Sequence, residues 1–305
     1  MRDFPSIINE LLNAFRENFE RSGNVWGFEV EIPYIQEQKF ISNGRMLALS
    51  TNEILIRAIK EAIFEFLIHE NAKYLDAKLL KSVELKRFVE NNVAKNMEKY
   101  LSILRRLNHL AQAKNISFVH LAASVAPEIM HFNPSAHISV ISPVLEKLSS
   151  IPCEEILVYD PIEYLILKAY EARIGKKVYH ILEKLSFEKR SLSERFIIKD
   201  PCILTRKANI NLRNYVNNIL ENLIHHPLSG SLTICCGEFM WITAPKIALN
   251  NAGEVLRALS SYSPRILTLC PSATFLFSVA KRFFTDLQNV KIVDLTEVIT
   301  TGESL

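Results

Sequence analysis

Hydrophobic residues recur with two different periods along the chain, and the period changes near residue 115. Before this point, apolar residues repeat every three to four positions, which is typical of amphipathic helices. The repeat predicts helices over 5–20, 51–69, 75–90 and 92–112, with irregular or short extended chain over 25–45. Residues 1–112 are therefore expected to form a helical N-terminal region.

After residue 115, short apolar runs alternate with longer amphipathic segments. The short runs predict buried strands, and the segments between them predict helices. This alternation is typical of a parallel sheet that helices cover on both faces, so we expect an α/β fold. Strands are predicted at 117–121, 155–159, 177–181, 196–198, 231–234, 265–269 and 291–295.

Composition is that of an ordinary globular chain. The 305 residues are 49% hydrophobic and 23% charged, enough for one large or two ordinary domains. The net charge of +3, without a basic block, argues against nucleic-acid binding. The most apolar stretch, 266–280, is too short to span a bilayer, and residues 1–20 lack the pattern of a secretory signal. We expect a cytoplasmic protein without a membrane span.

Four of the five cysteines form a nearly symmetric pattern. The vicinal pair Cys235-Cys236 precedes Gly237, and gaps of 32 and 33 residues separate the pair from Cys202 and Cys270. Each is predicted to follow the carboxyl end of a strand, and these ends share the sheet edge where open α/β folds bind ligands. Thiolates are ligands of iron–sulfur clusters and of tetrahedral zinc. Buried apolar thiols are the structural alternative.

The sequence around these cysteines resembles the cysteine-rich CCG domain. That domain occurs in heterodisulfide reductases and in the iron–sulfur subunits of glycolate, lactate and glycerol-3-phosphate oxidation systems. The resemblance covers about residues 195–299 and lies in Asp200-Pro201-Cys202, Cys235-Cys236-Gly237 and Leu269-Cys270-Pro271. It implies that Cys202, Cys235, Cys236 and Cys270 ligate a 4Fe-4S iron–sulfur cluster.

The same resemblance implies a place in a redox complex. The chain would be an electron-transfer subunit of a heterodisulfide-reductase-like or hydroxyacid-oxidase-like oxidoreductase. It lacks a relay of its own, so its partner would be a flavoprotein or a ferredoxin-bearing subunit. Residues 1–112 would then be either a degenerate ferredoxin-like region or an unrelated docking segment.

The family carries two repeats, so the chain is expected to contain two pseudo-repeated parallel-sheet halves. The degenerate first half would span 113–190, and the second half, with the cysteine site, would span 191–305. In the first half, Leu121 stands at a usual cysteine position, and Asp160 and Glu163 replace both cysteines of a Cys-Pro-x-Cys motif. No first cysteine pair is found.

The second half also departs from the family, because Ala273 stands where its last cysteine belongs. In the reductases, five cysteines hold a disulfide-cleaving cluster, whereas four suffice for an ordinary four-iron cluster or a zinc ion. An active protein would thus be a disulfide-reductase-like oxidoreductase subunit. The alternative is a degenerate structural or adaptor subunit with zinc or without a cluster.

Three other positions have both a structural and a functional interpretation. His225-His226 follows a predicted helix, where a positive charge is favourable, and a metal role is the alternative. Arg206 lies one turn beyond Cys202, where it would either steady an anionic group or remain solvated. Cys153 precedes a different strand and is not expected to be a ligand.

Overall fold

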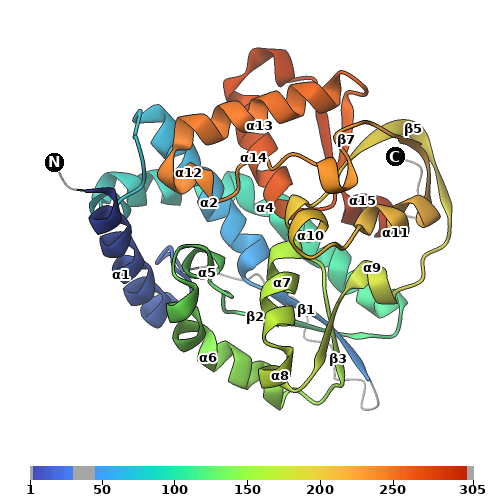
Figure 1. The fold of residues 1–305 in the computed structure, drawn as a ribbon, viewed down its shortest axis with the longest axis horizontal. Helices are drawn as coiled ribbons and strands as arrows, with labels where there is room; N and C mark the ends of the chain where they lie inside the picture. Colours follow the sequence, from blue (N-terminus) through green and yellow to red (C-terminus); the bar gives the residue numbers. More distant parts are fainter. Residues whose placement is uncertain (1–2, 30–44, 301–305) are drawn as a thin grey trace.

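Two parallel β-sheets with helices packed around them form the core of the protein. A computed structural model describes residues 3–29 and 45–300, and the chain in these ranges has the expected α/β fold. Each sheet has four strands, and every strand pair is parallel. In Figure 1 the first sheet lies in the lower part of the view and the second at the upper right.

Helix α1 precedes the first strand of the first half, and both of its ends are capped in the usual way. The Asp3 side chain accepts the Ser6 N–H, and Gly23 ends the helix in a left-handed conformation. The elements are α1 (Phe4–Ser22), β1 (Met46–Thr51), α2 (Glu53–His69), α3 (Ala77–Leu80), α4 (Val83–Ala113), β2 (Ser117–Leu121), α5 (Pro127–Phe132), α6 (Pro134–Ser150), β3 (Glu155–Val158), α7 (Pro161–Ala169), α8 (Glu171–Ile174), β4 (Lys177–His180) and α9 (Ile181–Lys184).

The second half has the same alternation of strands and helices. Its elements are β5 (Arg190–Lys199), α10 (Cys202–Lys207), α11 (Leu212–Ile219), β6 (Leu220–Ile224), η1 (Gly230–Leu232), α12 (Met240–Thr243), α13 (Pro245–Ser260), β7 (Arg265–Thr268), α14 (Pro271–Phe283), η2 (Thr285–Leu287), β8 (Lys291–Asp294) and α15 (Leu295–Thr300). None of the helices in the described ranges combines the length and apolar character needed to cross a membrane.

The two halves share one sheet topology. The strand order is β2-β1-β3-β4 in the first sheet and β6-β5-β7-β8 in the second. In both, the opening strand lies between the second and third strands of its half, and the fourth strand is at an edge. The sequence expectation of two similar halves is therefore confirmed, and each strand of one half has a counterpart in the other.

The opening strand of the first half was not expected. Residues 1–112 were predicted to be all helical, but β1 lies within them and pairs with both β2 and β3. The segment 117–121 is thus the second strand, not the opening one. β1 is short and runs almost directly into the apolar helix α2, so its residues share one apolar run with that helix. Of the stretch 25–45, which was predicted to be irregular or short extended chain, residues 30–44 lie outside the described residues.

Two further expectations need correction. The helices predicted near 75–90 and 92–112 are instead the short α3 and one long helix, α4. The strand predicted at 231–234 is absent from the described structure, where η1 and a loop occupy these positions. The second strand of this half is instead β6, which occupies the end of the segment before His225 that was predicted to be a helix. Leu232 and Ile234 are exposed, so no sheet buries them.

Helix α2 joins the two halves. Of its 17 residues, 15 are buried, and it packs on α4 of the first half and α14 of the second. Glu61 of α2 accepts hydrogen bonds from the Tyr100 hydroxyl at 2.8 Å and from Lys99 Nζ at 2.8 Å. Arg282 of α14 reaches the same carboxylate at 2.5 Å. A buried carboxylate thus holds three elements of both halves together.

A second buried contact crosses between the sheets at their carboxyl ends. The Tyr159 hydroxyl, after β3, donates to Asp294 Oδ1 at 2.7 Å, at the end of β8. Burial raises the pKa of Asp294 from its ordinary value of 3.8 to about 6, despite hydrogen bonds from Thr296 and Tyr159 that oppose the shift. The folded protein therefore holds a proton that the unfolded chain releases.

We expect this proton to make stability depend on pH. Between pH 4 and 6 the unfolded chain loses its Asp294 proton while the folded protein keeps it, so the contribution is complete below pH 4 and lost above pH 6. Compared with Asp294→Asn, the wild type should lose about 2 kcal/mol of unfolding free energy between pH 4 and pH 7. Urea unfolding of both proteins at the two pH values measures this, and a constant difference contradicts it.

Candidate functional site

Four cysteines of the second half line one open pocket, to which the first half also contributes. The pocket has a volume of about 500 Å³, and Cys202, Cys235, Cys236 and Cys270 all contribute to its wall. Cys236 and Cys270 are buried, while Cys202 and Cys235 are half-buried. The structure thus brings together the four thiols that the sequence singled out. The remaining lining residues are His131, Ile162, Ile203, Arg206, Gly237, Glu238, Phe239, Met240, Thr243 and Ser272.

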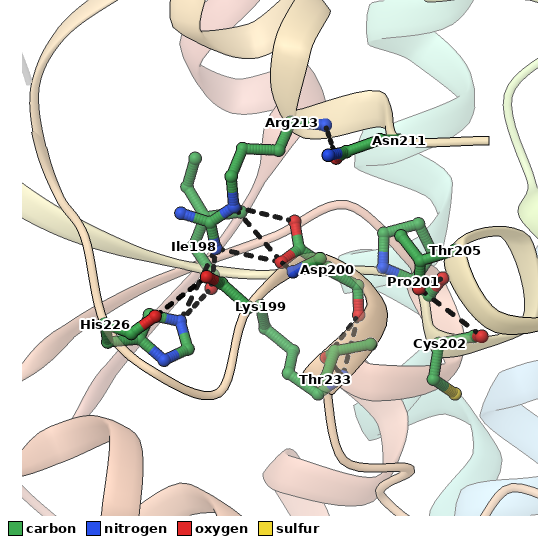
Figure 2. Close-up of polar contacts among 12 residues, drawn as sticks. Ile198, Lys199, Asp200, Pro201, Cys202, Thr205, Asn211, Arg213, His226 and Thr233 are labelled. Carbon is green, nitrogen blue, oxygen red and sulfur yellow. Dashed lines mark hydrogen bonds and ion pairs between the residues drawn. The ribbon is translucent and has the colours of Figure 1, made fainter. Parts of the chain in front are cut away.

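The turn after β5 places Cys202 at the first position of α10. The carboxylate of Asp200 forms a buried ion pair with Arg213 at 2.9 Å and accepts the Gly230 N–H at 2.8 Å. Arg213 also donates to the Ile198 carbonyl at 3.0 Å. Figure 2 shows this arrangement around the Asp200-Pro201-Cys202 turn. The ion pair therefore fixes the turn and holds the loop containing Gly230 against it.

The vicinal pair reaches the pocket on a loop. It was expected to follow a strand directly, but β6 ends at Ile224 and η1 comes between. Gly237 has a φ of +103°, a region that glycine adopts without strain, and its N–H points to Cys235 Sγ at 3.4 Å. Asn251 of α13 donates to the Cys235 carbonyl at 2.8 Å. The loop is thus held by its own turn and by α13.

Cys270 lies at the carboxyl end of β7, as expected, and precedes α14. The hydroxyl groups of Thr268 and Thr274 lie 2.7 Å apart and brace the strand end against the helix. Ala273, where the resemblance would place a fifth cysteine, is buried. Ser272 Oγ accepts a hydrogen bond of 3.1 Å from Arg57 of α2. A side chain of the first half therefore supports the third cysteine loop.

The thiols differ in acidity because of their surroundings. Donation of the Cys202 S–H to Cys235, followed by burial, raises the pKa of Cys202. The same hydrogen bond, aided by the N–H groups of Gly237 and Glu238, lowers the pKa of Cys235 against the effect of burial. Burial raises the pKa of Cys236, and that of Cys270 to about 11. Negative charge therefore develops first at Cys235.

The first half contains a counterpart of the vicinal pair that the sequence did not reveal. Asn133, before α6, has φ −149° and ψ 77°, and Ala244, before α13, has φ −152° and ψ 68°. These nearly identical helix starts align the two halves. Counting back the same number of residues from each, Ser124-Val125-Ala126 corresponds to Cys235-Cys236-Gly237.

The local geometry supports this correspondence. The N–H of Ala126 donates to Ser124 Oγ at 2.8 Å, as the N–H of Gly237 does to Cys235 Sγ. Ala126 also has a positive φ, 47°, which is uncommon for a residue with a side chain. The first half therefore has the same kind of turn, with Ser124 where the second half has Cys235.

The third cysteine position of the first half is held by Asp160. It follows β3 by two residues and precedes a proline that starts α7, as Cys270 does after β7. Its side chain accepts the Ile162 N–H at 2.8 Å and pairs with Arg57 at 2.5 Å. Asp160 was expected at this position. The expectation for Leu121 was wrong, because it ends the second strand rather than the opening one.

Buried charges surround this first-half position. Lys60 of α2 pairs with Glu128 at 2.5 Å, and its Nζ lies 3.8 Å from Glu53 and 3.7 Å from Glu238. Glu163, at the counterpart of Ala273, accepts the Thr51 N–H at 2.8 Å, and burial raises its pKa well above the usual range. The first half thus contains carboxylates and two cations where the second half contains thiols.

The other candidate residues have separate places. Cys153 lines a different pocket. His226 is buried with its ring nitrogen 2.9 Å from the Ile198 carbonyl, and His225 is exposed, so neither lines the thiol pocket. Arg206 is exposed and does line it. His131 was missed: it stacks on Phe239 with ring centroids 4.2 Å apart, and its sequence surroundings gave no signal.

The comparisons with known proteins leave the function to be inferred from this pocket. No protein-family model matches the sequence, and no curated protein matches it. Among the described residues, no three His, Cys, Asp or Glu side chains are arranged as the ligands of a single metal ion.

Proposed function

We propose that the thiol pocket holds an iron–sulfur cluster and that the protein is an electron-transfer subunit of a redox complex. The observation that carries the proposal is the convergence of Cys202, Cys235, Cys236 and Cys270 on one pocket from separate segments of the second half. Four thiolates are the ligand set of a four-iron cluster. They would hold the cluster, and the cluster would supply one-electron chemistry.

The surroundings of the thiols fit an anionic group. Backbone N–H groups approach Cys235 Sγ, and such hydrogen bonds tune iron–sulfur centres. Arg57 hydrogen-bonds Ser272 beside Cys270, and Lys199 lies beneath the Cys202 turn. Positive charge near thiolate sulfur favours the ionised form in which a thiol binds metal.

The pocket is large enough for a cluster. Its volume is about 500 Å³, which exceeds the space that a single ion needs. Zinc–sulfur bonds are about 2.3 Å long in a tetrahedral site, so four sulfurs would have to close directly around a zinc ion. Zinc is therefore an alternative that metal analysis must distinguish.

Electron exchange would require a partner, which we propose to be a flavoprotein or a ferredoxin-bearing subunit in the cytoplasm. Leu232, Ile234 and Met240 are exposed apolar residues on the segment that carries the cysteine pair, and Met240 lines the pocket. Exposed apolar side chains beside a site are typical of surfaces that bind other molecules. They support docking close to the thiols.

The competing function is a degenerate structural or adaptor subunit. Ala273 at the position of a fifth ligand favours it, and so do Ser124 and Asp160, which stand in the first half where the second half has Cys235 and Cys270. In that case the four remaining cysteines would hold zinc or no metal. The charged network around Lys60 would then serve only to hold the two halves together.

Metal analysis distinguishes these functions. Protein purified without oxygen should be brown and contain about four iron atoms and equivalent sulfide per chain. About one zinc per chain in a colourless protein supports the structural function instead. A colourless protein that remains free of iron and sulfide after anaerobic reconstitution contradicts the proposed cluster.

A further inference from the structure

A buried lysine lies beneath the thiol pocket without a carboxylate partner. Lys199, the last residue of β5, is only 2% exposed. Its Nζ donates to the Asp200 carbonyl at 2.7 Å and to Thr233 Oγ1 at 3.1 Å, as Figure 2 shows. Both acceptors are uncharged, and within the described residues no acidic side chain forms an ion pair with this ammonium group. A buried cation in this position needs another source of negative charge.

The carboxylate of the neighbouring residue, Asp200, is already paired. The side chain of Asp200 is turned to Arg213 at 2.9 Å and to the Gly230 N–H at 2.8 Å. Only the main-chain oxygen of Asp200 contacts Lys199. The other buried lysine near the site, Lys60, differs in this respect, because Glu128 lies 2.5 Å from its Nζ. Of these two lysines near the site, Lys199 is the one without a carboxylate partner among the described residues.

The thiols are the remaining candidates for its counter-charge. The two groups that accept hydrogen bonds from Lys199 Nζ belong to the two segments that carry these thiols: Asp200 lies two residues before Cys202, and Thr233 lies two residues before Cys235. The ammonium group is thus held between the α10 turn and the loop of the vicinal pair, where its charge can stabilise thiolates on both segments.

The first half provides an internal comparison. Across the sheet, Lys199 pairs with Thr268, and Leu49 pairs with Val158. Thr268 and Val158 are equivalent, since each lies two residues before the third ligand position of its half. Leu49 is therefore the counterpart of Lys199 and is equally buried, at 2% exposed. The half without the four-cysteine site has leucine at this position, and the half with that site has lysine.

We propose that Lys199 is a positioning residue whose buried charge balances the anionic thiolates and raises the reduction potential of the group they bind. The claim that Lys199 balances the thiolates is argued from its contacts. The claim that it raises the reduction potential rests on the proposed function. Adding an electron to an anionic centre is more favourable beside a fixed cation, because the cation offsets the added charge. Removing the cation should make reduction harder.

The test replaces Lys199 with the leucine of the first half and has two measurements. In reconstituted protein, Lys199→Leu should have a more negative midpoint potential than the wild type, and Lys199→Arg, which keeps the charge, should stay near it. In metal-free protein, urea unfolding of Lys199→Leu, Cys235→Ser and the double variant forms a double-mutant cycle. We expect Lys199→Leu to lower the free energy of unfolding less, or to raise it more, in the Cys235→Ser protein than in the wild type, because the thiolate that needs the lysine charge is then absent.

Each measurement can overturn the proposal. An unchanged potential in Lys199→Leu shows that the charge does not act on the bound group. Additive effects in the cycle show that Lys199 and Cys235 do not interact, which leaves Lys199 as a hydrogen-bond donor to Asp200 and Thr233 only. If the wild type takes up no iron, the proposed function fails separately, and the cycle still decides whether Lys199 balances the thiolates.

Discussion

Replacing Cys235 with serine should abolish iron binding and turn the anaerobically purified protein colourless. Cys235 is the thiol at which negative charge develops first, because Cys202 and the N–H groups of Gly237 and Glu238 donate to it. It also contacts Cys202 of the α10 turn, and its carbonyl accepts a hydrogen bond from Asn251 of α13, so no neighbouring thiol can replace it without moving the loop. Iron should fall from about four atoms per chain to well below one. Iron and sulfide analysis and the visible absorption spectrum measure this loss.

Cys153→Ser provides the matched control for this experiment. Cys153 is half-buried, like Cys235, but it lines a separate pocket beside Lys168 and Lys176. It should keep the iron content and colour of the wild type. Cys235→Ser protein that still binds a full complement of iron would show that the vicinal pair is not a ligand. A loss in both variants would point to a general effect of cysteine replacement.

The sequence predicted the second half better than the first because its signals are of different kinds. Cysteines are rare in the chain, so four of them at regular spacing stand out and indicate a common site without any structural detail. The strand and helix that hold Cys270 also have ordinary signals, an apolar run followed by a proline at the helix start. These residues could be placed from sequence alone.

The loop of the vicinal pair could not be placed in the same way. In 232–234, a polar residue lies between two apolar ones, and this alternation predicts a strand with the apolar side chains buried. In the structure, Leu232 and Ile234 are exposed, whereas Thr233 is buried against Lys199. The burial pattern is therefore the reverse of the one that apolar character predicts. Only the tertiary contacts of Lys199 and Asp200 decide that this segment is a loop.

The first half was misread for a related reason. Ser124 and Ala126 occupy positions equivalent to Cys235 and Gly237 of the second half, but neither resembles its counterpart in residue type. What the two halves share is backbone geometry: the positive φ at Ala126 and Gly237, and the matching helix starts. Backbone geometry leaves little trace in a single sequence when alanine replaces glycine. The repeat becomes visible only when the sheets are compared.

The same comparison explains why the buried helix α2 contains charged side chains. Arg57 of this helix contacts Asp160 in the first half and Ser272 in the second. It therefore links the replaced site to the loop of Cys270. Its guanidinium can serve two acceptors at once because it presents several donors in a fixed plane. Loss of this side chain should affect the folding of both halves.

Replacing Arg57 with methionine should accordingly lower the free energy of unfolding by about 3–5 kcal/mol, the usual cost of leaving one charge of a buried pair without its partner. Arg57 and Asp160 have side chains 1% and 0% exposed, so water cannot solvate the carboxylate that remains. Arg45→Met is the matched control, because its pair with Glu154 is 80% and 65% exposed and should contribute less than about 1 kcal/mol. Urea unfolding of both variants measures the difference.

A second substitution separates the charge from the lost packing of Arg57. Asp160→Asn removes the charge of the partner, and its side-chain oxygen can still accept the Ile162 N–H that starts α7. Added to Arg57→Met, it should restore part of the lost stability, because no unpaired charge then remains buried. If Arg57→Met costs no more than Arg45→Met, or if Asp160→Asn worsens it, the ion pair is not what joins the halves. Partial recovery would show that the first half now uses charge compensation at the position where the second half carries Cys270.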